Sequence, residues 1–161
     1  MGILSGLISE NVDRHTQDIV TLTATASITT ADHSGRTLLM GEVGGDAAAT
    51  FTLPAATGTG SVFRFVVSVI NTSNYLIKVA DATDTIDGQI VITDADGTDA
   101  ASFVTAATSD TITLNGTTTG GGAIGDYVEL IDIASNQYSV SGMVSCAAGS
   151  NIATMFSATV S

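Results

Sequence analysis

The sequence predicts an all-β fold, either an antiparallel β-sandwich or a jelly-roll-like or Greek-key barrel, with a short N-terminal arm. Thr and Val alternate with apolar and polar neighbours at period two, and Gly, Asn and Asp cluster between these segments. After residue 18, no stretch keeps a helical spacing of apolar residues. A chain of 161 residues suits one core. We therefore expect a single β-domain over residues 18–161, preceded by residues 1–17.

Residues 1–17 have a different pattern from the rest of the chain. Apolar side chains recur there at helical spacing, at Ile3, Leu4, Leu7 and Ile8, and a polar run follows. This pattern fits a short amphipathic helix and a flexible arm equally well. The segment has no basic residue ahead of its apolar positions, so it is not expected to act as a secretory signal. No apolar run reaches the length of a membrane helix, and we expect synthesis and assembly in a host cytoplasm.

The strands are predicted in order from the alternation. Residues 20–25 place apolar side chains on one face and threonines on the other, as a half-buried antiparallel strand does. Residues 61–70 are the most apolar, so we place this strand centrally, with its phenylalanine face in the core. Residues 71–74 form a turn cluster, and residues 75–79 are expected to return beside the strand as a hairpin. The remaining predicted strands are 51–53, 85–93, 101–105, 111–114, 127–133, 137–144 and 152–160. Among the loops, the glycine-rich residues 116–125 are expected to be the most mobile.

Charge and cysteine content exclude several classes of protein. Sixteen acidic residues against four basic ones give a net charge of −12, and the basic residues are well separated, which excludes a nucleic-acid footprint. We expect the acidic residues to form an acidic exterior. A single cysteine, Cys146, excludes a disulfide within the chain.

No enzyme active site is expected. Asp32, His33 and Ser34 are consecutive and cannot face one another as a proton relay requires, so they are interpreted as a turn before a strand at Arg36. Cys146 would need a histidine beside it to act as a nucleophile and is expected to be a buried or half-buried structural thiol. Two histidines without a second cysteine do not make a zinc site by spacing.

The strongest metal candidate is the acidic loop that contains Asp94, Asp96 and Asp99. Its carboxylates surround Gly97, as in loops that bind Ca²⁺. The glycine comes at the fourth position, and no Glu closes the loop at the twelfth, so the EF-hand spacing is not met. Residues 121–126 approximate a calcium-binding nonapeptide only once, whereas that architecture needs several repeats. We therefore expect solvated turns, with no metal and no cofactor.

Five segments together carry a resemblance to a known family. They are residues 51–60, 62–67, 74–80, 110–121 and 125–130. In these segments the chain resembles the capsid decoration, or cement, proteins of tailed bacteriophages. The resemblance implies a β-sandwich-like domain, usually trimeric, on the outer surface of the head, where it ties major capsid proteins together. It brings no catalytic residues with it.

The expected function is therefore that of a structural virion protein whose partner is the major capsid protein. We expect a homotrimer on the capsid surface, without nucleic acid or membrane, and capsid contacts through Ile3, Leu4, Leu7 and Ile8. The alternative is a tail-fibre or receptor-binding β-domain. That alternative predicts exposed aromatic side chains in a groove, for which Tyr75, Tyr127 and Tyr138 are the available tyrosines. A Ca²⁺-dependent adhesion or lectin domain is a third class.

Overall fold

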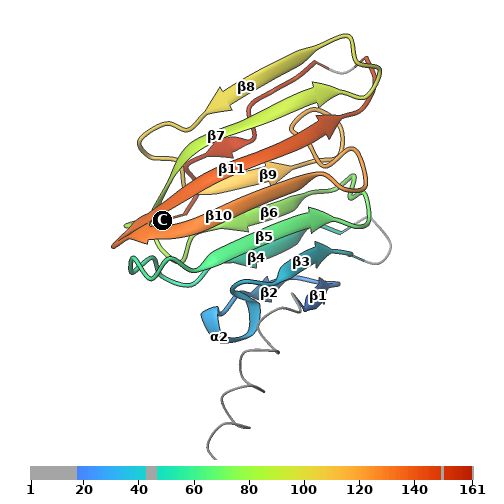
Figure 1. Cartoon of the computed structure of the whole chain (residues 1–161). Coiled ribbons are helices and arrows are strands. Elements are labelled where there is room, and N and C mark those ends of the chain that lie inside the picture. Colours follow the sequence, from blue (N-terminus) through green and yellow to red (C-terminus); the bar gives the residue numbers. More distant parts are fainter. Residues whose placement is uncertain (1–17, 43–46, 150, 161) are drawn as a thin grey trace, which may run out of the picture.

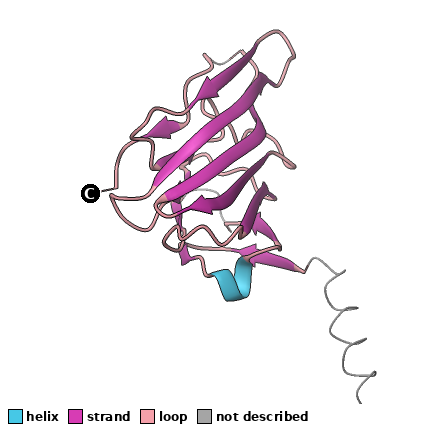
Figure 2. Ribbon diagram, turned by 60° about the vertical axis from the view of Figure 1, so that its left-hand side comes forward, coloured by secondary structure: helices cyan, strands magenta, loops and turns pink. Residues whose placement is uncertain are grey.

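Two β-sheets pack face to face in the computed structural model, which describes residues 18–42, 47–149 and 151–160 (Figure 1). Nearly all regular structure in these residues is strand, and one short helix lies at an end of the sandwich (Figure 2). The predicted all-β sandwich is thus confirmed. The predicted arm, residues 1–17, lies outside the described residues.

The larger sheet has seven strands and the smaller one has five. In spatial order, the seven-stranded sheet contains β1 (Ile19–Leu22), β3 (Thr37–Met40), β5 (Val62–Val67), β10 (Tyr127–Ala134), β11 (Gln137–Cys146), β7 (Thr85–Asp94) and β8 (Ala100–Val104). The five-stranded sheet contains β12 (Phe156–Ser157), β9 (Thr111–Leu114), β6 (Tyr75–Lys78), β4 (Ala49–Thr52) and β2 (Ala26–Ser27). The helix is α2 (Thr30–His33).

The first six strands alternate between the two sheets. As a result β1, β3 and β5 lie side by side in parallel, and β2, β4 and β6 do the same in the other sheet. The second half adds antiparallel pairs, including β7 with β8 and β10 with β11, while β11 also pairs with β7 in parallel over ten residues. Both sheets are therefore mixed. The sequence predicted antiparallel pairing only, and this prediction is wrong for the parallel pairs.

The predicted hairpin between residues 61–70 and 75–79 is wrong, because β5 and β6 belong to different sheets. Asn71 redirects the chain between them: its Oδ1 accepts hydrogen bonds from the backbone N–H groups of Ser73 (2.8 Å) and Asn74 (3.1 Å). Its Nδ2 also donates to the carbonyl oxygen of Ala47 (2.8 Å), ahead of β4. The turn expected at residues 71–74 is present, but the hydrogen bonds of Asn71 make it an arch between the two sheets and not a hairpin turn.

The core lies between the two inner faces. Phe65 of β5 stacks on Phe51 of β4, with ring centroids 5.8 Å apart, and Phe51 also stacks on Tyr75 of β6 at 5.9 Å. All three rings are fully buried. Such aromatic contacts add to the stabilisation that burial of each ring provides. The prediction that the phenylalanine face of the central strand lies in the core is confirmed for Phe63 and Phe65.

The glycine-rich loop after β9 is fastened to the sandwich. Asn115 Oδ1 accepts hydrogen bonds from the N–H groups of the three threonines that follow it. Gly122 donates to Ser145 O (2.8 Å), and a Cβ at Gly120 would approach Val144 to 2.4 Å. The glycines are therefore needed for close packing against β11. These contacts restrain the loop against the mobility expected from its glycine content.

Candidate functional site

The predicted capsid-binding residues, Ile3, Leu4, Leu7 and Ile8, lie outside the described residues, as does His15. Asp32, His33 and Ser34 form α2 and the turn after it, where Thr29 Oγ1 caps the helix by accepting from the Asp32 N–H (3.2 Å). Cys146 is fully buried in β11, and burial raises the pKa of its thiol. The prediction of a buried thiol is confirmed.

Asp94 is the last residue of β7, and Asp96 and Asp99 lie in the turn between β7 and β8. Hydrogen bonds engage the carboxylates of Asp94 and Asp96. Asp94 accepts from the N–H groups of Asp96 (3.0 Å) and Gly149 (3.1 Å). Asp96 accepts from the N–H and hydroxyl of Thr98, and these bonds lower the pKa of Asp96. Across the described residues, no group of three acidic, histidine or cysteine side chains is arranged to hold a metal ion.

Buried aspartates form the feature that sequence reasoning missed. Asp132 on β10 accepts hydrogen bonds from the backbone N–H groups of Thr57 (3.0 Å), Gly58 (2.6 Å) and Thr59 (3.0 Å). Burial alone would raise the pKa of Asp132, but these bonds outweigh burial and hold that pKa below its usual value. The loop they fasten joins β4 of one sheet to β5 of the other, so Asp132 connects the two sheets.

Other buried carboxylates fasten loops in the same way. Asp126 accepts from the backbone N–H of Ser145 (2.8 Å), and Asp110 accepts from the N–H groups of Thr159 (2.8 Å) and Val160 (3.2 Å). At least six acidic side chains are buried: Glu42, Asp84, Asp94, Asp110, Asp126 and Asp132. The expectation that the acidic residues form the exterior is corrected for these six. A sequence signal was present, because Asp84, Asp110 and Asp126 each stand directly before an alternating strand.

The outer face of the five-stranded sheet is rich in hydroxyl groups. One row of register partners crosses all five strands, and it consists of Ser27, Thr52, Lys78, Thr111 and Ser157. The next row contains Thr50, Leu76 and Thr113. Thr111 is fully buried, and its hydroxyl bonds to Asp110 and Thr159. The other side chains of these two rows are at least partly exposed. Because hydroxyl groups hydrogen-bond to water, this face is suited to contact with solvent outside Thr111.

The outer face of the seven-stranded sheet carries an apolar row. Register partners across all seven strands are Thr21, Leu39, Val66, Tyr127, Met143, Val91 and Ser102. Met143 is 55% exposed and Val91 is 36% exposed. Five of the large apolar side chains exposed to solvent lie on strands of this sheet, namely Ile19, Val91, Val104, Ile133 and Met143, and none lies on a strand of the five-stranded sheet. We call this outer surface the docking face.

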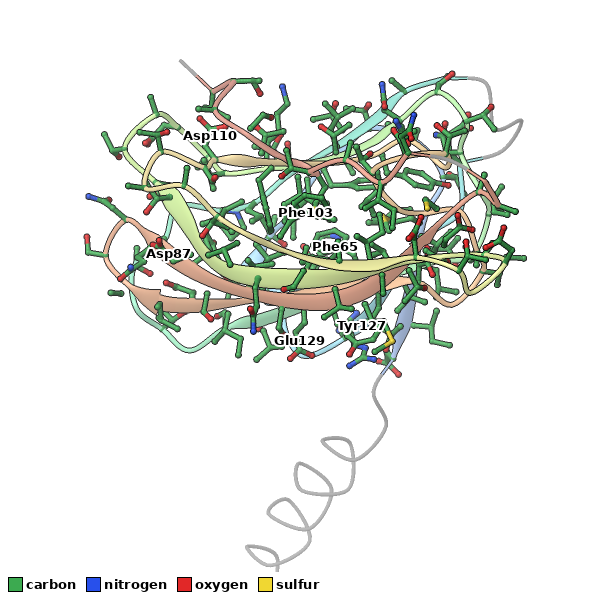
Figure 3. The ribbon with its side chains drawn as sticks, turned by 90° about the horizontal axis from the view of Figure 1, so that it is seen from above. Phe65, Asp87, Phe103, Asp110, Tyr127 and Glu129 are labelled. Atoms are coloured by element: carbon green, nitrogen blue, oxygen red, sulfur yellow. The ribbon has the colours of Figure 1, made fainter. Side chains whose placement is uncertain are left out.

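The docking face is close to neutral in a chain of net charge −12. The charged side chains on its strands that are not buried are Asp87 of β7, Glu129 of β10 and Arg64 of β5, and Glu129 is the register partner of Arg64. Arg36 lies in the turn before β3. The Arg64 guanidinium lies 4.1 Å from the centroid of the Tyr127 ring, and its Nη1 is 3.5 Å from Glu129 Oε2. Tyr127 and Glu129 point away from the interior, where Phe65 and Phe103 lie (Figure 3). The acidic groups of the chain therefore do not dominate this face.

The three tyrosines do not gather in one groove. Tyr75 and Tyr138 are fully buried, and Tyr138 donates its hydroxyl to the Pro54 carbonyl oxygen (2.8 Å). Tyr127 alone lies on an outer face, beneath Arg64. The tyrosine groove that the receptor-binding alternative predicts is therefore not formed by these residues.

Comparisons with protein families, curated proteins and solved structures find no match to this chain. No helix among the described residues is long and apolar enough to cross a membrane.

Proposed function

We propose that this protein is a structural virion protein, a capsid decoration protein that docks on the outside of a phage head and stabilises contacts between major capsid proteins. The observation that carries the proposal is the difference between the two outer faces. A protein that lies on a shell needs one face for the shell and another for water. The apolar docking face and the hydroxyl-rich face opposite support that division.

The dimensions of the docking face also support a protein partner. Seven strands at their usual spacing span about 30 Å. With strands of about 20 Å, the face offers roughly 600 Å², which approaches the roughly 800 Å² per partner of a standard interface. Met143 is 55% exposed, so complete burial would contribute about half of the roughly 1.5 to 3 kcal/mol of a fully exposed side chain, before ordering costs.

The N-terminal residues are part of the proposal. Asp18, the first described residue, directly precedes β1, an edge strand of the seven-stranded sheet. Ile3, Leu4, Leu7 and Ile8 are therefore joined to the chain at an edge of the docking face, and we assign them as an additional anchor. In a homotrimer, three anchors on neighbouring capsid subunits would gain from effective concentration.

Binding to heads tests the proposal directly. Purified protein is mixed with empty, undecorated heads of the phage that encodes it, and the bound fraction is measured by sedimentation. We expect saturation at a fixed ratio to the capsid subunit. Heads that never bind the protein would contradict decoration and favour the tail-fibre alternative.

A pair of matched variants tests the docking face. Met143→Glu places a charge in the apolar row, whereas Thr113→Glu places the same charge on the opposite face. We expect Met143→Glu to weaken head binding roughly thirtyfold, about 2 kcal/mol, and Thr113→Glu to leave it nearly unchanged. Equal binding by both variants would show that this face is not the contact surface. Circular dichroism melting checks that both variants are folded.

Deletion of residues 2–12 tests the anchor separately. The truncated protein should keep the melting behaviour of the full chain but dissociate faster from heads. Equal retention would contradict the anchor while leaving the docking face in place.

Light scattering of the full chain at micromolar concentration tests the trimer, and a monomeric mass both in solution and after release from heads would contradict it.

A further inference from the structure

A surface pocket opens on the docking face beside the Arg64–Glu129 pair. It has a volume of about 230 Å³ and is lined by Gly35, Arg36, Val62, Arg64 and Glu129. Gly35 adopts a left-handed conformation (φ 72°), and a Cβ at this position would meet nothing within 4 Å. The pocket is therefore open beside Gly35, and its wall combines the aliphatic side chain of Val62 with two arginines and one glutamate.

The two arginines differ in their partners. Arg64 is held over the Tyr127 ring and reaches Glu129 through one contact at 3.5 Å, the long limit of a hydrogen bond. A guanidinium has five N–H donors, so most of those of Arg64 are left for another acceptor. Arg64–Glu129 is the only ion pair found among the described residues, and no described carboxylate lies within 4.0 Å of the Arg36 guanidinium. Arg36 is thus a half-buried cation without a described acidic partner.

The local charge of this pocket is opposite to that of the whole molecule. Its two arginines outnumber its one glutamate, whereas the chain carries 16 acidic and 4 basic residues. Planar guanidinium groups match the geometry of a carboxylate, which accepts paired N–H bonds. Glu129 limits the positive charge, which disfavours a more highly charged anion such as phosphate.

We propose that this pocket binds a carboxylate, and that its occupant is an Asp or Glu side chain of the protein that docks on this face. The identity of that partner rests on the proposed function, whereas the carboxylate site itself does not. The carboxylate binds between Arg36 and Arg64, while the neighbouring apolar row contacts the aliphatic surface around it. Because the chain carries a net charge of −12, the excess of arginine in this pocket favours an acidic partner group at this position of the docking face, and it fixes the register of docking.

Titration with sodium acetate tests the site without a partner. Backbone amide resonances of Gly35 and Val62 are followed by NMR, with sodium chloride and sodium phosphate at matched ionic strength as comparisons. We expect saturable shifts with acetate that are lost in Arg36→Gln and kept in Lys78→Gln, the matched loss of a cation on the opposite face. Equal responses to acetate and chloride, or shifts that survive in Arg36→Gln, would overturn the site. A stronger response to phosphate would overturn the assignment to a carboxylate.

Binding to heads tests the identity of the occupant. We expect Arg36→Gln to lower the affinity about tenfold and Lys78→Gln to change it less than about twofold. If the unmodified protein binds and Arg36→Gln binds equally well, the pocket is outside the interface and the assignment to a partner carboxylate fails, while the proposed function stands. If the unmodified protein does not bind, the proposed function and this occupant fail together, and the acetate titration alone decides whether the pocket is a carboxylate site.

Discussion

The outer faces of the two sheets follow the same alternation but carry opposite chemistry. In β6, buried Ile77 alternates with Leu76 and Lys78, and the row through Lys78 is otherwise Ser and Thr. In β10, buried Val128 alternates with Tyr127, which belongs to the apolar row. Inner faces must be apolar because they make the core, whereas outer faces are free to match what they contact. The difference between the outer faces therefore reports on partners more directly than the core does.

The largest expected effect is on stability, and it compares an inward-facing with an outward-facing position of β5. Phe65→Ala leaves a cavity beneath Phe51 and should lower the free energy of unfolding by about 4 kcal/mol. Val66→Ala, its outward neighbour, should lower it by about 1 kcal/mol or less. Urea denaturation of both variants measures the contrast. Similar losses would mean that the outer side of β5 is as important to folding as the inner side.

Asp132 stabilises the packing of the two sheets, because it binds the loop that crosses from β4 in one sheet to β5 in the other. Asp132→Asn keeps the size of the side chain but brings an amide N–H₂ towards backbone donors, and should cost roughly 2 to 3 kcal/mol near neutral pH. Asp96→Asn in the exposed β7–β8 turn is the control and should change stability little. Thermal melts of both variants at one pH make the comparison.

The pH dependence of these carboxylates can be predicted from the direction of each pKa. The pKa of Asp132 is lowered on folding, so its stabilisation is present above its unfolded pKa of about 3.9 and is lost as pH falls through the folded value. Burial raises the pKa of Asp84, despite the hydrogen bond from the Ala56 N–H. The stabilisation that Asp84 contributes to the fold is therefore fully present below its unfolded pKa and is lost as pH rises through its folded pKa.

Stability measured against pH for two variants separates these opposite signs. The cost of Asp132→Asn should shrink as pH falls from about 6 to about 3, whereas Asp84→Asn should become relatively more favourable as pH rises over the same range. Parallel curves for both variants would contradict the assigned directions.

The smallest effect on stability is expected when an apolar residue of one outer face and a hydroxyl residue of the other are each replaced by the opposite type. Met143→Thr should reduce retention on a hydrophobic-interaction column, and Thr113→Met should increase it. Each variant should change the free energy of unfolding by no more than about 0.5 kcal/mol, since both side chains point away from the core. Unchanged retention in both variants would remove the distinction between the faces.

The period-two pattern was enough to locate most strands and to place Phe63 and Phe65 in the core. It does not report the direction of a neighbouring strand, which is why the parallel pairs were missed. Short β2, with two residues, leaves no measurable alternation. The arch at Asn71 was interpreted as a hairpin because turn residues fix a reversal but not the sheet to which the chain returns.

The candidate site was harder to predict than the fold. Leu39, Val66, Tyr127, Met143 and Val91 come from five separate segments, and only the sheet register brings them into one row. The pocket likewise joins Arg36 to Arg64 across the β3–β5 pair. For Asp84, Asp110 and Asp126, the sequence does show a signal, because each stands directly before a predicted strand. Their burial could not be predicted, because it depends on which backbone N–H groups the fold brings to each carboxylate.

The ten-residue parallel pairing of β7 with β11 has a consequence for how the chain folds. Until β11 has been synthesised, β8 is the only neighbour that β7 has in its sheet, and an isolated two-stranded hairpin is marginally stable in water. Each of strands β1 to β6, in contrast, has a neighbour within this first half of the chain, and only β5 and β6 gain a second neighbour later, β10 and β9 respectively. A fragment that ends at residue 134 should therefore show no hydrogen-exchange protection in β7. The sheet that carries the docking face is completed late, by a contact between distant parts of the chain.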